Sequence, residues 1–221
     1  MPPAAAASRA SSFTPRPYPG SAPASRRFRG TIGIRTREAT IAARPEIRPL
    51  APAAAGDDAT VTTLTDLVNE VYAESEKGLW ADGAVRTTTR ELAGLVRAGE
   101  IAVARVDGRI AGCVRVHRID AGTSEFGLLA ADPRHRGVGV GRELVRFAER
   151  HAREQGDGRM RLELLMPRDR SHPAKEFLAA WYDRLGYAVV RAGTMEDSHP
   201  HLARLLATPC DVLIYEKDLR A

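Results

Sequence analysis

A glycine-rich segment flanked by arginines stands out at residues 132–144, DPRHRGVGVGREL. Glycines alternate with valines there, so little side-chain bulk blocks the approach of a ligand to the backbone. Backbone N–H groups that converge at the start of a helix bind anions, and arginine binds phosphate through two parallel hydrogen bonds. The segment therefore favours the binding of a pyrophosphate. Its candidate ligands are Arg136, Gly137, Val138, Gly139, Val140, Gly141 and Arg142.

The spacing of the glycines excludes two common pyrophosphate-binding motifs. A Walker loop ends in Gly-Lys followed by Ser or Thr, and the sequence contains no such run. A dinucleotide-binding fold needs Gly-x-Gly-x-x-Gly, but counting from Gly137 the third glycine position holds Arg142. A tight turn between a strand and a helix, with no ligand, is the alternative interpretation of the same glycines.

The spacing Arg136-x-x-Gly139-x-Gly141 resembles the Q/R-x-x-G-x-G/A motif of the GNAT superfamily of N-acetyltransferases. The order of elements from Glu46 to the end of the chain is similar as well. The resemblance implies acetyl-CoA as co-substrate. It also implies that the strand before the loop splays from the next parallel strand and binds the pantetheine arm of the cofactor as an added strand would. The strand edge concerned is Leu128, Leu129 and Ala130.

A second motif, residues 181–187 (WYDRLGY), resembles the Y-x-x-x-G-F signature of the same family. Tyr182 takes the tyrosine position, whose hydroxyl in that family lies near the cofactor sulfur and protonates the leaving thiolate. The alternative is that Tyr182 packs, like Trp181 beside it. Lys175 departs from the family pattern, because an asparagine that contacts the cofactor is common at this position.

Acetyl transfer to an amine also needs a base, since an alkyl amine has a pKa near 10.4 and is mostly protonated at pH 7. Glu125 is the candidate base, because it lies in an apolar strand whose alternation places Glu125, Gly127 and Leu129 on one face. Partial burial is expected to raise the pKa of Glu125. The alternative is a solvated glutamate at a strand end.

The acceptor pocket is predicted from two segments. The family resemblance implies that the segment linking the first two helices, here residues 72–80, forms one wall. It supplies Tyr72, Glu74, Glu76 and Trp80, and a carboxylate of Glu74 or Glu76 would attract an ammonium group that the indole covers. The predicted hairpin supplies Arg115 and His117, which suit a carboxylate. A solvated helix end and an exposed strand face are the alternative for any one of these residues.

Apolar periodicity and turn residues predict the elements that position these side chains. Their order is strand, two helices, three strands, helix, strand, helix, strand, which is a mixed α/β sheet in a single domain. Asp107-Gly108 is the expected hairpin turn, and Ser171 is the expected cap of the last helix. The resemblance implies a mostly antiparallel sheet with one splayed parallel strand pair. The predicted strands are 47–50, 100–106, 109–119, 124–130, 159–166 and 211–216, and the predicted helices are 61–75, 87–98, 142–155 and 173–185.

The charge of the chain is concentrated in its first 45 residues. That segment carries eight arginines and one acid, so it contributes +7 to a chain of net charge +5 and leaves −2 for residues 46–221. Residues 1–45 are predicted to be a disordered tail and residues 46–221 the acetyltransferase domain. A transit peptide and an overextended start remain open for the tail. The acidic balance of the domain argues against nucleic acid as a partner.

The cysteines and the apolar runs of the sequence bear on disulfides, metal sites, membrane spans and cellular location. Cys113 and Cys210 are far apart in the sequence and match no paired-cysteine motif, so neither a disulfide framework nor a metal site is expected. Cys113 is expected in the core. No apolar run reaches the roughly 20 residues of a membrane helix, and a cytoplasmic location is expected. The histidines at 199 and 201 are interpreted as loop residues.

These observations predict an enzyme that transfers acetyl from acetyl-CoA to the amine of a small molecule, by direct attack in a ternary complex. A protein or peptide N-acetyltransferase and a non-catalytic acyl-CoA-binding sensor are the alternatives. A homodimer is compatible with the sequence.

Overall fold

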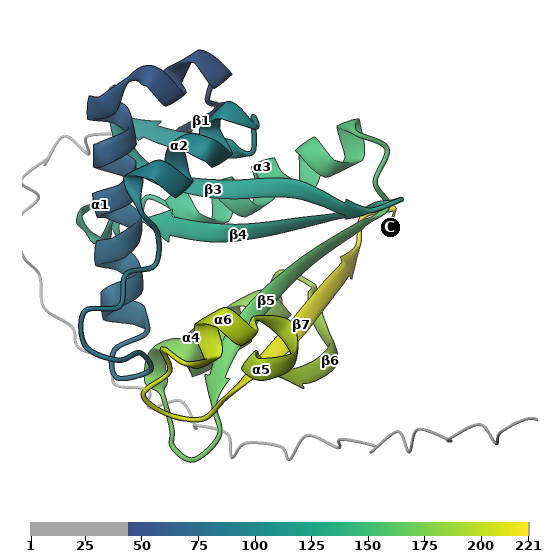
Figure 1. Cartoon of the computed structure of the whole chain (residues 1–221). Coiled ribbons are helices and arrows are strands. Elements are labelled where there is room, and N and C mark those ends of the chain that lie inside the picture. The colour runs from purple at the N-terminus through teal and green to yellow at the C-terminus, as the bar shows by residue number, and fades with distance from the viewer. Residues whose placement is uncertain (1–43, 221) are drawn as a thin grey trace, which may run out of the picture. The chain divides into compact units, whose positions relative to one another are not determined.

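A seven-stranded sheet forms the centre of the protein, in the order β1-β2-β3-β4-β5-β7-β6. The computed structural model describes residues 44–220, so the predicted tail, residues 1–45, falls outside the described residues apart from its last two. Every neighbouring pair is antiparallel except β4 and β5. The strands are β1 (Glu46–Pro49), β2 (Ile101–Val106), β3 (Arg109–Asp120), β4 (Thr123–Ala131), β5 (Arg159–Pro167), β6 (Ala188–Thr194) and β7 (Cys210–Asp218) (Figure 1).

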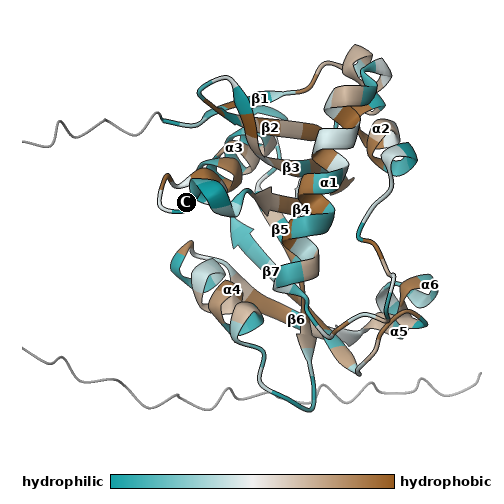
Figure 2. Cartoon of the chain, turned by 90° about the vertical axis from the view of Figure 1, so that its left-hand side faces the viewer, coloured by the Kyte–Doolittle hydropathy of each residue, from teal (hydrophilic) through white to brown (hydrophobic). Residues whose placement is uncertain are grey.

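Helices cover both faces of the sheet, which confirms the predicted fold class. Seen along the sheet in Figure 2, α3 and α4 lie on one side, here called the rear face, and α1, α2, α5 and α6 lie on the other, the front face. The helices are α1 (Asp58–Ser75), α2 (Thr89–Arg97), α3 (Val140–Glu154), α4 (Pro173–Arg184), α5 (Met195–Ser198) and α6 (Pro200–Ala203), with short 3₁₀ turns η1 (Pro52–Gly56) and η2 (Pro133–His135).

The alternation of strand residues divides the core between these two faces. On β2, Ala102 and Ala104 pack in the rear cluster with residues of α3, whereas Ile101 and Val103 pack in the front cluster with α1 and α2. A third cluster lies on the front face of the other half of the sheet, where Met195 of α5 packs on β5 and β7. Burial of these apolar side chains is the main force that holds helices to the sheet.

Strands β4 and β5 pair over only three positions, Thr123–Glu125 against Arg159–Arg161. Beyond Glu125, β4 continues to Ala131 and β5 to Pro167 without pairing, so the strands diverge and a gap opens between the two halves of the sheet (Figure 1). The short paired stretch is called the seam below. The divergence agrees with the splayed pair that the family resemblance implied.

Local sequence signals account for most element boundaries. Asp107 and Gly108 adopt φ angles of 51° and 76°, which suits the tight turn between β2 and β3. Thr88 and Glu91 form a reciprocal capping box at the start of α2.

Two predictions about the last third of the described chain were wrong. Strand β6 was not predicted, because its residues are mostly exposed at the sheet edge and show no buried face. Ser171 does not cap α4. Pro173 takes the first helical position, which leaves His172 as the cap residue, and the Ser171 hydroxyl donates to the Glu176 carboxylate instead.

Candidate functional site

The glycine loop leaves a row of backbone donors free at the start of α3. Gly137 and Gly139 adopt φ angles of 88° and 84°, a region that other residues rarely enter. No side chain caps α3, and the N–H groups of residues 139–142 donate to no backbone carbonyl within residues 44–220. These are the donors that an anion satisfies at a helix N-terminus.

The side chains around this loop add positive charge. Arg136 and Arg142 are exposed, and neither forms an ion pair with another described residue. The nearby Asp132 is buried and is bound by the backbone N–H and the guanidinium of Arg134, with Nε 2.9 Å from both carboxylate oxygens. The hydrogen bonds from Arg134 lower the pKa of Asp132. The two free guanidinium groups therefore face no competing carboxylate in the loop.

A bulge in β4 changes which face its residues present. Leu128 has a φ of 45°, and Cys113 pairs with Ala130 while Arg115 pairs with Gly127, so two residues of β4 oppose one of β3. Leu128 and Ala130 pack in the front cluster and Leu129 in the rear cluster. The prediction that Leu129 shares a face with Glu125 was therefore wrong, because period-two alternation holds only in a regular strand.

Glu125 lies on the front face at the last paired position of the seam. Its Oε2 is 2.7 Å from Nε of Arg161 on β5, and its Oε1 is 3.9 Å from Nε2 of His117 on β3. Burial raises the pKa of Glu125, and the neighbouring Arg161 opposes that rise. The carboxylate thus stands beside the gap between the strands with only 18% of its side chain exposed.

Polar and charged contacts continue along the front face beyond Glu125. Arg161 Nη2 is 2.8 Å from Glu163 Oε1, and Glu163 Oε2 is 2.7 Å from His199 Nε2. These three residues line a cavity of about 460 Å³ together with Arg191 and Asp197. Sequence reasoning missed this group, although the alternation of β5 with buried Met160 and Leu162 places Arg161 and Glu163 on the opposite face.

Two of the predicted acceptor-site residues lie on β3. Arg115 already pairs with Glu100, at 2.7 Å between Nε and Oε2. His117 has a buried Nδ1 with no hydrogen-bond partner in residues 44–220, and burial together with Arg115 lowers its pKa. These surroundings favour the neutral form of the imidazole beside Glu125.

Tyr182 lies on α4 and packs in the rear cluster. Its ring is 6% exposed and packs against Phe126, Tyr187 and Tyr215 at centroid distances of 6.1, 6.1 and 6.0 Å. Burial raises the pKa of the Tyr182 hydroxyl, and the nearby hydroxyl of Tyr72 on α1 raises it further. Tyr182 therefore both packs and remains protonated, which is the state that a proton donor needs.

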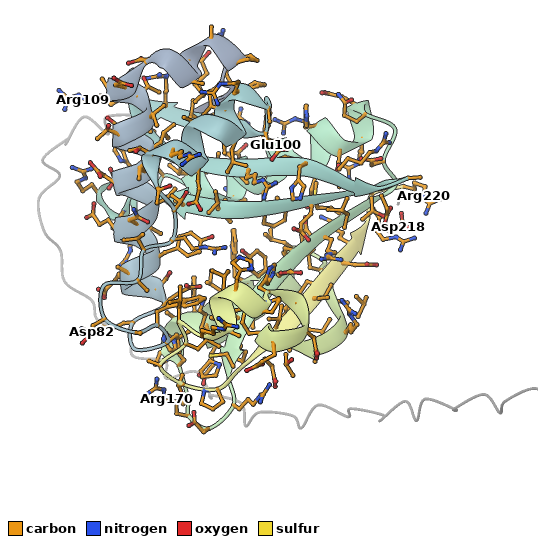
Figure 3. All side chains as sticks on the ribbon, in the orientation of Figure 1. Asp82, Glu100, Arg109, Arg170, Asp218 and Arg220 are labelled. Carbon is orange, nitrogen blue, oxygen red and sulfur yellow. The ribbon has the colours of Figure 1, made fainter. Side chains whose placement is uncertain are left out.

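The connection between α1 and α2 is fastened to the start of α4 across the wide end of the gap. Lys175 Nζ is 2.6 Å from Glu76 Oε1, with side chains only 3% and 7% exposed. Arg170 donates to the Gly78 carbonyl, and His172 Nε2 lies 3.2 Å from the Lys77 carbonyl oxygen. Figure 3 shows Arg170 at this end of the molecule. These contacts are called the clasp, and they occupy the lysine that replaces the family's asparagine.

The remaining predicted acceptor-site residues surround the clasp. Trp80 donates from Nε1 to Glu76 at 2.5 Å and forms a β-bridge with Leu206. Glu74 is exposed and forms no ion pair within the described chain. Tyr72 is partly buried, with the Arg86 guanidinium 4.9 Å from its ring centroid. Glu76 is therefore bound by Lys175 and Trp80.

Cysteine and metal chemistry find little support in the described residues. Cys113 and Cys210 are buried, and burial raises the pKa of their thiols to about 12 and about 11. Residues 44–220 contain no group of three potential metal ligands. None of the helices in this part of the chain combines the length and apolar character of a membrane span.

Solved structures with this fold are numerous. PaiA N-acetyltransferase from Thermoplasma acidophilum, in complex with coenzyme A, is 17% identical, with a TM-score of 0.57 over 79% of this chain and 98% of its own. The structure of yncA from Salmonella typhimurium, solved with its cofactor acetyl-CoA, is 17% identical, with a TM-score of 0.55 over 80% of this chain and 94% of its own. Ribosomal-protein-alanine N-acetyltransferase from Brucella melitensis is 16% identical, with a TM-score of 0.55 over 78% of this chain and 99% of its own. No curated protein sequence matches the chain.

The sequence profile of the Acetyltransferase (GNAT) family matches residues 65–197, which is more than half of the chain. This match includes the glycine loop, the seam and the helix that carries Tyr182. It confirms the resemblance that the loop motif indicated. The chain therefore belongs to the GNAT family of acetyltransferases, whose co-substrate is acetyl-CoA.

Proposed function

We propose that the protein transfers an acetyl group from acetyl-CoA to the amine of a small molecule. The proposal is supported by the positions of a carboxyl group, Glu125, on the front face of β4 and a buried phenol, Tyr182, that packs on Phe126 of β4 and Tyr215 of β7 from the rear. Glu125 stands on the front face, with a raised pKa, and Tyr182 enters from the rear face, where it stays protonated. The anion-binding loop at the start of α3 holds the pyrophosphate of the cofactor.

The chemistry is a direct transfer. The amine nitrogen attacks the thioester carbonyl carbon, a new C–N bond forms, and the C–S bond breaks. Glu125 accepts the proton that the ammonium group loses before attack. Tyr182 donates a proton to the leaving thiolate and regains one from the nitrogen, which loses its second proton once the C–N bond has formed. A covalent acetyl-enzyme is disfavoured, because the two buried cysteines have raised thiol pKa values and carry no activating base.

A small acceptor is favoured over a peptide by the closure of the front face. The Trp80–Leu206 bridge is extended by hydrogen bonds from Ala81 N to Leu205 O at 2.8 Å and from Ala207 N to Leu79 O at 2.9 Å. The α1–α2 and β6–β7 connections are thus joined over the site. The hollow of about 460 Å³ that residues of β5, β6 and α5 line is large enough for a small ligand.

The test uses purified full-length protein with acetyl-CoA and a thiol reagent. We expect free CoA to appear only when an acceptor amine is added, and to rise with the acceptor concentration. Release dependent on a peptide but on no small amine would favour the protein acetyltransferase. Tight CoA binding without acceptor-dependent release from any amine or peptide would favour the sensor.

A further inference from the structure

The cavity on the front face contains one cation that the protein does not neutralise. Arg161 forms ion pairs with Glu125 and Glu163, and Glu163 also lies within hydrogen-bond distance of His199 Nε2. Arg191 lines the same cavity but forms no ion pair with any residue of 44–220. The other acidic residue of the lining, Asp197, accepts a hydrogen bond from the Thr194 hydroxyl at 2.8 Å.

A bulge in β6 places Arg191, an exposed residue of the edge strand, on the sheet face that this cavity occupies. Val189 pairs with Tyr215 and Arg191 with Ile214, so Val190 is an extra residue. Tyr215 belongs to the rear cluster, and paired residues of antiparallel strands share a face. Without the bulge, Arg191 would share the rear face with Val189. With it, Arg191 lies on the front face, in the same cross-strand row as Ile214 and Glu163.

Bulges often re-aim a side chain next to a binding site, and a solvated arginine that protects the sheet edge would not need one. Together with Glu125 and Glu163, the cavity offers carboxylates near the gap and a guanidinium farther from it. That distribution matches a ligand with a positive group at one end and a negative group at the other.

Resting on the proposed function, we propose that the acceptor is an amine that also carries a carboxylate, which Arg191 binds. The ammonium end is drawn to the carboxylates of Glu125 and Glu163, and Glu125 then accepts its proton. A carboxylate fits better than a phosphate dianion, because Glu163 and Asp197 line the same cavity and would repel a second negative charge. Guanidinium and carboxylate form two parallel hydrogen bonds, which also orients the amine.

The test measures kcat/KM for matched pairs that differ only in the carboxylate. The probes are L-alanine, L-leucine, L-glutamate, β-alanine and 4-aminobutyrate, each beside its carboxamide. We expect at least one acid to be acetylated and to exceed its carboxamide by about 10- to 100-fold. In Arg191→Gln this preference should fall to near unity through a higher KM for the acid, and Arg191→Lys should retain part of it.

Arg109→Gln is the matched control, because it removes the same charge from an exposed position at the far end of the sheet (Figure 3). It should preserve the preference. Carboxamides acetylated as well as the acids, or a preference that survives Arg191→Gln, would overturn the carboxylate assignment. So would a panel in which no acid reacts. If no acid reacts but carboxamides or simple amines do, the proposed acetyltransferase function stands and the carboxylate assignment fails. If no amine of any kind reacts, the proposed function and the carboxylate assignment both fail.

Discussion

The clasp offers a direct measurement of how the two halves of the molecule are held together. Lys175→Met removes the ammonium from a pair whose side chains are 3% and 7% exposed. Glu76 then keeps one partner, the Trp80 N–H, and its carboxylate remains buried. An unpaired buried charge of this kind costs about 3–5 kcal/mol of unfolding free energy. For a domain of this size that corresponds to a decrease in Tm of about 6–20 °C.

Urea denaturation of four proteins completes the experiment: the wild type, Lys175→Met, Glu76→Gln and the double variant. Glutamine retains an oxygen that accepts from Trp80 without leaving a charge behind. The double variant should therefore be more stable than Lys175→Met alone, with a coupling energy of about 2 kcal/mol or more. Lys77→Met, which removes an exposed neighbouring lysine, should change stability by less than about 0.5 kcal/mol.

Two results would refute this reasoning. A loss below about 1 kcal/mol in Lys175→Met would mean that water reaches Glu76. Additive effects in the double variant would mean that the two side chains do not act as a pair.

Three further predictions concern the site. Gly139→Glu should weaken CoA binding at least about tenfold in calorimetry, since it adds negative charge at the free N–H groups, whereas Gly139→Ala should weaken it less; equal effects would remove the electrostatic argument. Burial raises the pKa of Glu125, so kcat/KM should rise with pH through a limb above the ordinary carboxyl value of about 4.3. In Glu125→Gln that limb should disappear and activity should recover only at high pH, where the amine deprotonates unaided; an unchanged profile would exclude Glu125 as the base. Tyr182→Phe keeps the packed ring, so it should lower kcat by about 10- to 10³-fold with little change in the Kd for CoA, and full activity would leave Tyr182 a packing role alone.

Local signals in the sequence were sufficient for most of the fold. The glycines at 137 and 139 require positive φ values, and the Asp107-Gly108 turn fixes the hairpin, so both could be identified from residue type and spacing. Strand β6 could not, because an exposed edge strand has no buried face to produce a pattern. Its place at the sheet edge is set by pairing with β7, the next strand along the chain.

The candidate site was less predictable than the loop for a related reason. Glu125 and Tyr182 were identified from one strand and one motif, but the partners of Glu125, His117 and Arg161, come from β3 and β5. Two bulges, at Leu128 and Val190, reverse the sheet face on which the following residues lie. No residue type in either segment predicts a bulge. Lys175 was recognised as a departure from the family pattern, but its partner Glu76 is nearly a hundred positions away.

The seam and the clasp stand at opposite ends of the gap between β4 and β5. The separation of β4 and β5 is therefore fixed at both ends of the gap, by strand pairing at the seam and by the ion pair of the clasp. Between these ends, the edges of β4 and β5 that face each other have no strand partner. Because folding already orders the two strands, they lose little conformational entropy when the cofactor binds. That entropy loss therefore does not weaken binding. CoA should accordingly raise the thermal stability of the protein while causing little change in backbone hydrogen exchange outside the gap.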